Sequence, residues 1–223
     1  MRLKINFEGS NTVYKNNCLP QVKGWFEDNV IGRNNNTHDE ASDYCLSPMF
    51  GGVRQKNTEI FPNGGYVYFT TSSIELIGKV SMGLFNANGS AVGDLHFKSF
   101  EMVKDFHIHS DYDIIRTLSP LLLRSSHKNI TINDNIFLSL LIDRCVKKLI
   151  KYGIPENKAK TLKIEFFHPE RATVIDMQYN TVHNLATKAM FIVRGNKEAR
   201  EMLYSLGFGS STGCGFGTIS VND

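Results

Sequence analysis

The sequence predicts an α+β protein made of two tandem ferredoxin-like (RRM-like) domains with a C-terminal glycine-rich loop. One observation is that the strand and helix patterns of the first half follow the order β, α, β, β, α, β, which is the ferredoxin-like order. The other is that the second half repeats this order of elements. No low-complexity linker divides the halves, so we expect domains at 1–110 and 111–223 that pack closely.

The elements of the first half are read from the spacing of apolar residues, which is two in a strand and three or four in a helix. Proline in the first turn and glycine after the last turn mark the limits of a helix, and a serine commonly caps its start. These patterns predict a strand at 2–8, a helix between Pro20 and Gly32, a strand at 66–71, a helix that Ser72 caps, and extended chain from Ala91 to Phe106.

The second half is read in the same way. It begins with an apolar run that fits a buried strand, and a long amphipathic segment follows. The predicted elements are a strand within 114–124, a helix at 135–152, strands at 162–167, 172–177 and 185–193, a helix that Asn196 caps, and a final strand at 216–221.

Cysteine use and hydropathy favour a cytoplasmic protein. The cysteines are widely scattered, with no C-x-x-C pair and no histidine at zinc-ligand spacing, so we expect reduced, mostly structural thiols at Cys18, Cys45, Cys145 and Cys214. No apolar run approaches the ~20 residues that cross a bilayer, and the amino terminus lacks a secretory apolar segment. We therefore expect no membrane partner, no metal and no other cofactor.

Charge is distributed unevenly along the chain. Residues 1–111 hold 10 Lys and Arg against 12 Asp and Glu, whereas residues 112–223 hold 15 against 10. A basic half indicates a polyanionic partner, because each cation set against a phosphate releases a condensed counterion. A solvated basic surface without a partner would have the same composition.

The segment from Gly207 to Gly217 carries five glycines, and its place in the chain limits what it can do. Dinucleotide-binding and P-loop glycines lie between a strand and a following helix, whose N-terminus meets a phosphate. Here a helix is predicted before the glycines and a strand after them, which argues against both motifs. Two interpretations remain, a tight helix-to-strand turn and a loop whose backbone approaches an RNA phosphate.

The two Gly-Phe-Gly units of this segment resemble the C-terminal motif of a known family. They are Gly207-Phe208-Gly209 and Gly215-Phe216-Gly217, followed by a predicted strand. The family is that of the CRISPR-associated repeat-processing endoribonucleases of the repeat-associated mysterious protein (RAMP) superfamily. Weaker points of resemblance are an initial Met-Arg-Leu, Leu19-Pro20 before the first helix, Ser47–Gly52, and Thr117–Pro120.

The resemblance implies tandem ferredoxin-like folds and cleavage of a CRISPR repeat transcript (pre-crRNA) without a metal. In such chemistry the 2′-hydroxyl attacks the adjacent phosphate and leaves 2′,3′-cyclic phosphate and 5′-hydroxyl ends. The reaction needs a base, an acid and positive charge for the phosphorane oxygens. His38 occupies the place of the family's general base, and Asp39 follows it as an acidic residue does in the family.

Two departures from the family pattern leave the remaining catalytic roles open. Ala41, Ser42 and Asp43 stand where some members have a lysine, and the first helix has no tyrosine at the family's usual place. Candidates near His38 in the sequence are Arg33, Tyr44, Arg54 and Lys56, of which Tyr44 and Lys56 are our further catalytic candidates.

RNA contacts are expected mainly from the basic second half and from the glycine-rich loop. A helix face with Arg144, Lys147, Lys148 and Lys151 is a weaker candidate, because such faces are usually only solvated. The predicted RNA-binding residues are Arg33, Arg54, Arg171, Lys188, Arg194, Gly207, Gly209, Ser210, Ser211, Gly213, Gly215, Phe216 and Gly217.

Two further groups of residues have more than one interpretation. Tyr66, Tyr68 and Phe69 are candidates for base stacking, but alternate positions of that strand must face the core. His107 and His109 would share one face of a strand and could act as acid and base or bind a metal, but no third ligand lies at a diagnostic spacing, so we expect a surface position.

The sequence leaves two functions open. The first is an endoribonuclease that cleaves CRISPR repeat RNA through His38. The second is a non-catalytic RNA-binding RAMP subunit of a CRISPR effector complex, which the missing lysine after His38 keeps open. A homodimer is compatible with either function.

Overall fold

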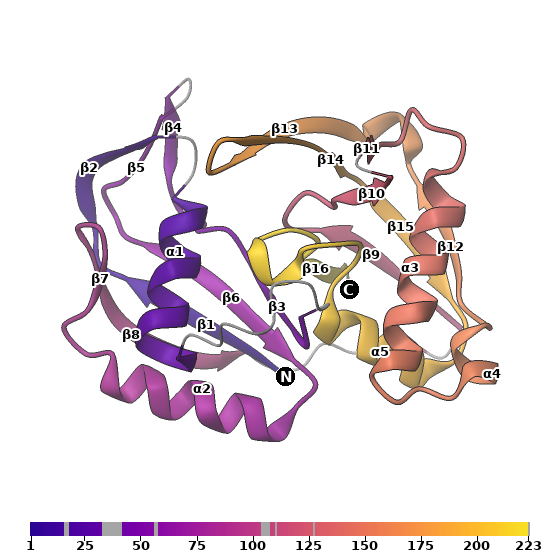
Figure 1. Cartoon of the computed structure of the whole chain (residues 1–223), viewed down its shortest axis with the longest axis horizontal. Helices are drawn as coiled ribbons and strands as arrows, with labels where there is room; N and C mark the ends of the chain where they lie inside the picture. The colour runs from indigo at the N-terminus through magenta and orange to yellow at the C-terminus, as the bar shows by residue number, and fades with distance from the viewer. Residues whose placement is uncertain are drawn as a thin grey trace.

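The first half of the chain folds around a sheet whose first strand lies in the middle. The computed structural model describes residues 1–15, 18–32, 42–55, 58–103, 108–109, 111–126 and 128–222. Its main N-terminal elements are β1 (Arg2–Phe7), α1 (Leu19–Phe26), β3 (Tyr44–Leu46), β6 (Gly65–Thr71), α2 (Ile74–Asn86), β7 (Ala91–Val92) and β8 (Leu95–Val103). The strand order is β3-β6-β1-β8-β7 with antiparallel neighbours, so the ferredoxin-like prediction is confirmed (Figure 1).

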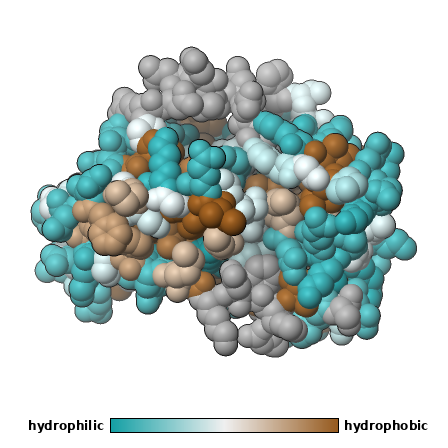
Figure 2. Space-filling model, turned by 90° about the horizontal axis from the view of Figure 1, so that it is seen from below, coloured by the Kyte–Doolittle hydropathy of each residue, from teal (hydrophilic) through white to brown (hydrophobic). Residues whose placement is uncertain are grey.

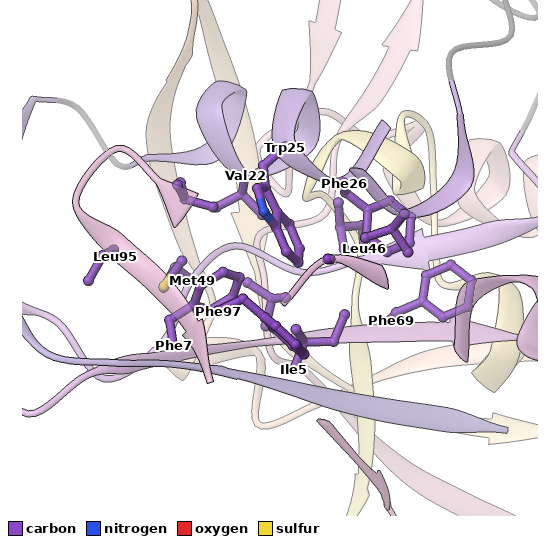
Figure 3. Close-up of a cluster of buried hydrophobic side chains, with 14 of the residues drawn as sticks. Ile5, Phe7, Val22, Trp25, Phe26, Leu46, Met49, Phe69, Leu95 and Phe97 are labelled. Atoms are coloured by element: carbon purple, nitrogen blue, oxygen red, sulfur yellow. The ribbon is translucent and has the colours of Figure 1, made fainter. Parts of the chain in front are cut away.

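Both helices pack on one face of this sheet, because apolar residues alternate along its strands. Ile5 and Phe7 of β1 join Val22 and Trp25 of α1 in one buried cluster (Figure 3). The rings of Phe7 and Trp25 are 5.0 Å apart between centroids. Burial of each such side chain contributes on the order of 2 kcal/mol. The other face of the sheet therefore carries the polar and tyrosine positions of β1 and β6.

The helix limits follow local backbone chemistry. α1 continues into a π-helical turn, η1 (Glu27–Ile31), and Gly32 follows it with a φ of 77°. This confirms the predicted end. The cap of α2 is Ser73 and not Ser72, because the capping side chain must directly precede the first helical residue. The Ser73 hydroxyl accepts a hydrogen bond from the Leu76 amide at 3.1 Å.

A second, smaller sheet of the N-terminal domain was not predicted. It consists of β2 (Ser10–Lys15), β4 (Val53–Gln55) and β5 (Thr58–Phe61), in the order β2-β5-β4. Its strands are short and only partly buried, so their sequences show no clear alternation.

The C-terminal domain repeats the ferredoxin-like arrangement. Its elements are β9 (Tyr112–Thr117), β10 (Leu123–Ser125), β11 (Lys128–Ile130), α3 (Phe137–Lys151), α4 (Glu156–Ala159), β12 (Lys163–Phe167), η2 (Pro169–Arg171), β13 (Thr173–Tyr179), β14 (Val182–Lys188), β15 (Met190–Arg194), α5 (Lys197–Leu206), η3 (Thr212–Cys214) and β16 (Ile219–Asn222). The order β12-β15-β9-β16 places the first strand beside the third and fourth. The β13–β14 hairpin is inserted between the second and third strands of this sheet.

Two strand predictions in this domain were wrong in extent. The apolar run 185–193 is two strands that Ala189 separates, because β14 pairs with β13 whereas β15 pairs with β12 and β9. A run of apolar residues gives no sign of such a change of partner. The last strand begins at Ile219 and not at Phe216, because Gly217 has a φ of 67° and interrupts the extended chain.

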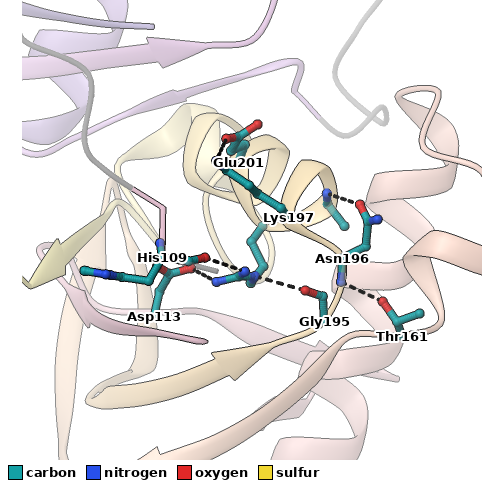
Figure 4. A network of polar contacts seen from close by, with 9 residues as sticks. His109, Asp113, Thr161, Gly195, Asn196, Lys197 and Glu201 are labelled. Atoms are coloured by element: carbon teal, nitrogen blue, oxygen red, sulfur yellow. Dashed lines mark hydrogen bonds and ion pairs between the residues drawn. The ribbon is translucent and has the colours of Figure 1, made fainter. Parts of the chain in front are cut away.

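A buried ion pair holds the start of the C-terminal domain against α5. Arg200 and Asp113 are fully buried and paired with each other (Figure 4). Arg200 also donates to the carbonyl of His109 at 2.8 Å and to that of Gly195 at 3.1 Å. Asn196 caps α5 as predicted, since its side chain accepts from the Ala199 amide at 3.2 Å. His109, next to the predicted domain boundary, is thus held by hydrogen bonds to both β9 and α5.

No helix in the described ranges is both long and apolar enough to span a membrane.

Candidate functional site

The glycine-rich loop lies where the two domains meet. It joins α5 to β16 and contacts α1 and β3 of the N-terminal domain (yellow segment in Figure 1). Phe208 is buried in the C-terminal core, whereas Phe216 packs with Leu19, the first residue of α1. Across the junction, the Thr212 hydroxyl donates to the carbonyl of Tyr44 at 3.2 Å. The loop therefore connects the domains by direct packing.

Contacts within the protein account for two of the loop glycines. Gly215 has a φ of 88°, and a Cβ atom there would lie 2.2 Å from Cδ1 of Leu19. Gly217 has a φ of 67°, and a Cβ atom would lie 1.9 Å from the carbonyl oxygen of Phe208. Both a left-handed conformation and close packing exclude side chains at these positions. The tight-turn interpretation thus holds for these glycines whether or not RNA contacts the loop.

Most of the loop residues predicted to contact RNA are buried. These are Gly207, Gly209, Gly213, Gly215, Phe216 and Gly217. Of the loop's predicted contacts, Ser211 is exposed and Ser210 is half-buried, so these two present side chains to a ligand. Contact between the loop and RNA remains a prediction.

A cluster of polar side chains, the junction cluster, lies between the domains beside this loop. Its central member is Lys23 of α1, whose side chain is only 17% exposed. The Lys23 amine donates to Sγ of Cys214 at 3.3 Å and lies 3.4 Å from a carboxylate oxygen of Glu27. The cluster comprises Lys23, Glu27, Tyr44, Tyr179 and Cys214, contributed by α1, η1, β3, β13 and the loop.

Electrostatics keep Lys23 charged although it is largely buried. Burial lowers the pKa of Lys23, but Cys214, Tyr179 and Glu27 outweigh this effect and raise it above its ordinary value. Burial in turn raises the pKa of Tyr179 to about 12, and Cys214 adds to that shift. At neutral pH the cluster therefore presents an ammonium group beside a neutral phenol.

Tyr44, a predicted catalytic residue, belongs to this cluster. Its ring packs against Phe26 and Phe69, with centroids 6.0 and 5.5 Å away. Burial raises the pKa of Tyr44, while Lys23 opposes the shift. The hydroxyl consequently stays protonated at neutral pH, so it can donate a hydrogen bond but is unsuited to act as a base.

The other predicted catalytic residues, His38 and Lys56, lie outside the described residues, as does Arg33. On the C-terminal side of 33–41, the described chain reaches the junction at Ser42. Gly32 follows the turn that continues α1, and Ser42 packs on the loop, since a Cβ atom on Gly213 would lie 2.5 Å from the Ser42 hydroxyl. Ser42, four residues after His38 in the sequence, is thus the described residue nearest to His38 that contacts the glycine-rich loop.

Lys148 has a different role from the one predicted. Expected on a solvated basic face of α3, it is buried, and its amine donates to the carbonyls of Leu206, Gly207 and Gly209 at 3.3, 3.3 and 3.1 Å. It satisfies carbonyl groups at the C-terminal end of α5 and in the loop, as a cation near a helix end commonly does. Burial lowers the pKa of Lys148. Lys148 therefore supports the loop and is not available to an RNA surface.

The remaining predicted RNA-binding cations are exposed but not gathered on one element. They are Arg54 on β4, Arg171 in η2, Lys188 on β14 and Arg194 on β15. Arg194 lies over the ring of Tyr112, 4.8 Å from its centroid. One face of the β13–β14 hairpin packs on the loop through Met177 and Ala186. The structure leaves all four cations accessible to a polyanion.

The tyrosines of β6 lie on the face of the sheet that the helices do not cover. Phe69 belongs to the core, but Tyr66 and Tyr68 are half-buried and 5.4 Å apart between ring centroids. Phe50 lies 5.5 Å from Tyr66, and the Lys4 amine is 4.9 Å from the Tyr66 centroid. Such a group of rings with a nearby cation can stack an unpaired base.

The cysteines and histidines show no additional catalytic arrangement in the described chain. Cys18, Cys45 and Cys145 are buried, and burial raises the pKa of each thiol, which fits the predicted structural role. His107 is outside the described residues, so the predicted pair with His109 cannot be placed. Within the described ranges, no three His, Cys, Asp or Glu residues are grouped so that they could hold a metal ion.

Lys23 is the member of the junction cluster that sequence reasoning missed. It lies in the predicted first helix, four residues before Glu27, where a lysine usually forms an ordinary surface ion pair. The only sequence signal was negative, namely that this helix lacks the family's tyrosine. Its position in the cluster depends on the packing of the loop, which lies nearly two hundred residues later in the chain.

Comparisons with known proteins agree with this geometry. The family model "CRISPR associated protein Cas6, C-terminal" matches residues 102–221, more than half of the chain. A CRISPR-associated endoribonuclease-like protein Cas6 from Pyrococcus furiosus is 25% identical over 185 residues, covering 76% of this chain and 73% of that protein.

Solved structures show the same fold over the whole chain. A structure described as a Cas6-related gene from Pyrococcus furiosus superimposes with a TM-score of 0.83 at 19% identity, covering 100% of this chain and 98% of that one. A RAMP protein described as binding different RNA substrates gives 0.83 at 17% identity and full coverage of both chains. Cas6 from Thermus thermophilus gives 0.63 at 12% identity, covering 99% of this chain and 97% of that one.

Proposed function

The chain belongs to the CRISPR-associated Cas6 family, and on that premise we propose that it is an endoribonuclease that binds and cleaves CRISPR repeat RNA. The observation that carries the proposal is the junction cluster. It combines a largely buried cation with protonated phenols beside the loop that Ser42 contacts, and Ser42 lies four residues after His38 in the sequence. The Pyrococcus relative described as endoribonuclease-like and the RAMP protein described as binding RNA support both parts of the proposal.

The proposed reaction is metal-independent attack of a 2′-hydroxyl on the adjacent phosphate. His38 takes the proton of the 2′-hydroxyl, the P–O5′ bond breaks, and the products are a 2′,3′-cyclic phosphate and a 5′-hydroxyl end. A neutral imidazole suits the base because its pKa lies near neutral pH. The departing 5′ oxygen takes up a proton from solvent to become the 5′-hydroxyl, and the imidazolium of His38 returns its proton to solvent.

Besides the base, the reaction needs positive charge and a hydrogen-bond donor at the phosphate, and we assign these roles to Lys23 and Tyr44. The ammonium group of Lys23 stabilises the charge that develops on the phosphorane oxygens, and the hydroxyl of Tyr44 donates a hydrogen bond to the same phosphate. Lys23 in this role compensates for the absence of a lysine at Ser42 and Asp43. Lys56 and Arg33 remain candidates for further phosphate contacts on sequence grounds.

The test uses the purified chain and the repeat RNA of its host in the presence of EDTA. We expect the native chain to cleave the RNA and His38→Ala to bind it without cleavage. A repeat with a 2′-deoxy substitution at the cut site should bind and stay intact. Absence of cleavage by the native chain would overturn the enzymatic proposal, and full activity of His38→Ala would overturn only the role of that residue.

A non-catalytic RNA-binding subunit of an effector complex is the second candidate. The observation that favours it is the same departure from the family, since Ser42 and Asp43 stand where some members carry a lysine. In that case the native chain binds the repeat with an affinity that His38→Ala does not change, and cuts no RNA under any of these conditions.

A further inference from the structure

Tyr179 is a member of the junction cluster to which the proposed reaction gives no role. It is the last residue of β13, and it is the phenol of the cluster that the C-terminal domain contributes. Its side chain packs against the buried cluster that contains Leu19 of α1 and Phe216 of the glycine-rich loop, as does that of Cys214. Tyr179 is only half-buried, so it remains open to a ligand. The junction therefore holds a hydrogen-bond donor without an assigned function.

Alternation along β13 explains the position of this phenol. Residues two apart in a strand share a face, so Tyr179 extends the inward row of Ile175 and Met177 to the tip of the β13–β14 hairpin. Tyr179 pairs with Val182, and the chain turns between them at Asn180, whose φ of 53° suits a tight hairpin turn. Figure 1 shows this tip reaching towards α1. The inserted hairpin thus carries a phenol from the second domain to the first.

The hairpin is fixed both to the rest of its domain and across its own strands. Thr187 of β14 and Leu121 exchange backbone hydrogen bonds of 2.7 and 2.9 Å. Asn184 is buried, and its amide group donates to the carbonyls of Met177 and Val182 at 3.4 and 3.2 Å. A donor that is already in place costs little reorganisation when charge develops on a substrate. The phenol at the hairpin tip is preorganised in this sense.

The surface of the molecule favours approach of RNA from the side of the hairpin. On the opposite side, α2 presents large apolar side chains, since Ile74, Met82 and Phe85 are 79%, 64% and 70% exposed. Figure 2, which views the molecule from that side, shows hydrophobic side chains gathered there. Such a surface gives a phosphate backbone nothing in exchange for its hydration. The strands β4 and β14, on the hairpin side in Figure 1, carry the exposed cations Arg54 and Lys188.

We infer, resting on the proposed function, that Tyr179 is a catalytic residue that donates a hydrogen bond to the departing 5′ oxygen and relays to it the proton taken up from solvent. In-line attack places the attacking and departing oxygens on opposite sides of the phosphorus, so the base and the leaving-group donor approach from different sides. His38 and Tyr44 belong to the N-terminal domain, whereas Tyr179 belongs to the C-terminal domain.

The two phenols of the cluster also approach the glycine-rich loop at different residues. A Cβ atom on Gly213 would lie 3.2 Å from Cε2 of Tyr44. Tyr179 packs instead against the cluster that contains Phe216. Two donors separated in this way can serve different oxygens of one phosphate, Tyr44 a non-bridging oxygen and Tyr179 the departing one.

The proton transfers balance. As the O2′–P bond forms and the P–O5′ bond breaks, Tyr179 gives its phenol proton to O5′, and the phenolate then takes a proton from solvent, which His38 restores. Burial raises the pKa of Tyr179 to about 12, so the phenol is protonated at neutral pH. A departing alkoxide is about as basic as hydroxide, whose conjugate acid, water, has a pKa of about 15.7. Transfer of the phenol proton to O5′ is therefore favourable.

The test compares single-turnover cleavage of two RNAs, the natural repeat and a repeat in which sulfur replaces the 5′ oxygen at the cut site. A thiol has a pKa of about 8.5, so a thiolate departs without a proton donor. We expect Tyr179→Phe to cleave the natural RNA about 10²-fold more slowly than the native chain, the usual effect of losing a general acid, and the sulfur-containing RNA at the native rate. Tyr112→Phe, which removes the same hydroxyl from a tyrosine 43% exposed on β9, is the matched control and should cleave both RNAs at the native rate.

Lys23→Ala separates the leaving-group role from stabilisation of the phosphorane. Because Lys23 is assigned to the phosphorane oxygens, its loss should slow cleavage of both RNAs by a similar factor. Tyr179→Phe should bind the 2′-deoxy repeat with native affinity, since the ring is kept and the lost donor acts in the transition state. Cleavage of the sulfur-containing RNA at the native rate also shows that Tyr179→Phe is folded.

A native rate of Tyr179→Phe on the natural RNA would overturn the inference and leave the proposed function intact. An equal loss of rate on both RNAs would also overturn it, because a structural role of the hydroxyl, or its contact with a non-bridging oxygen, predicts that result. If the native chain cuts neither RNA, the proposed function fails and the role of Tyr179 fails with it.

Discussion

At the scale of single residues, the functional side chains are those whose surroundings change their chemistry. Lys23 and Lys148 are both lysines on helices close to the glycine-rich loop, yet they differ in what they meet. Lys148 is fixed by three carbonyl groups and has a lowered pKa because of burial. Lys23 meets a thiol and a carboxylate at the domain junction and has a raised pKa. The first is structural, and the second remains a cation that can meet a phosphate.

Lys23→Ala is expected to lower the rate of repeat cleavage at saturating RNA by on the order of 10²-fold, the usual effect of removing one preorganised group that stabilises a transition state. Lys23→Arg keeps the charge and should retain part of the rate. The measurement is single-turnover cleavage, which separates chemistry from binding.

Lys147→Ala is the matched control for charge, since Lys147 lies in an exposed ion pair with Asp143 on α3. It should leave the single-turnover rate unchanged. A loss of rate in Lys23→Ala no larger than that in Lys147→Ala would show that Lys23 does not act on the reacting phosphate.

At the scale of elements, the glycine-rich loop is determined by close packing. It turns at Gly215 and Gly217 with positive φ, and those backbones lie against Leu19 and Phe208. The helix that precedes the loop is supported by a side-chain cap at its start and by Lys148 at its end. The loop is therefore closely packed at the junction, and its shape determines where Cys214 lies relative to Lys23.

Gly217→Ala should destabilise the protein by more than 2 kcal/mol, because a positive φ disfavours alanine by ~1 kcal/mol and the added Cβ atom meets the Phe208 carbonyl. Urea unfolding followed by circular dichroism measures the change. Gly24→Ala in α1 is the control, since its Cβ position has nothing within 4 Å and its φ is helical. Alanine there should stabilise by about 0.5–1 kcal/mol, and equal effects of both changes would contradict the assigned role of the loop.

At the scale of the whole molecule, the two domains share one packed junction. The Arg2 guanidinium donates to the carbonyl of Ile219 at 2.7 Å and lies 4.2 Å from the ring centroid of Tyr204. The Cys45 thiol lies 3.2 Å from the hydroxyl of Thr218. Buried polar groups of the N-terminal domain thus have their partners in the C-terminal domain. Separation of the domains would leave these polar groups without hydrogen-bond partners in the protein.

We therefore expect the chain to unfold in a single cooperative transition, with equal calorimetric and van't Hoff enthalpies. Differential scanning calorimetry checks this. Arg2→Met removes the guanidinium charge and its hydrogen bonds but keeps a long apolar side chain. We expect it to lower the temperature of the unfolding transition or to split that transition into two. Two separate transitions in the native chain would show that the domains are independent, with a boundary near residue 110.

The sequence predicted most regular elements because their physical causes are local. Alternation along β1, the Pro20 and Gly32 limits of the first helix, and the Asn196 cap each involve residues close in the chain. Errors occurred where a distant partner decides the outcome. The change of sheet at Ala189, the burial of Lys148 and the position of Lys23 beside Cys214 all depend on residues that periodicity does not relate.

By itself, the sequence determined the tandem ferredoxin-like fold, the element order and the pair of Gly-Phe-Gly units that marks the family. Each of these follows from the spacing of residues that are close together in the chain. Only the tertiary structure decided which side chains meet at the junction, which lysine is structural, and that one face of α2 is left uncovered. The physical reason is that charge, burial and pKa depend on neighbours in space. Segments as distant as α1 and the glycine-rich loop become neighbours only when the two domains pack.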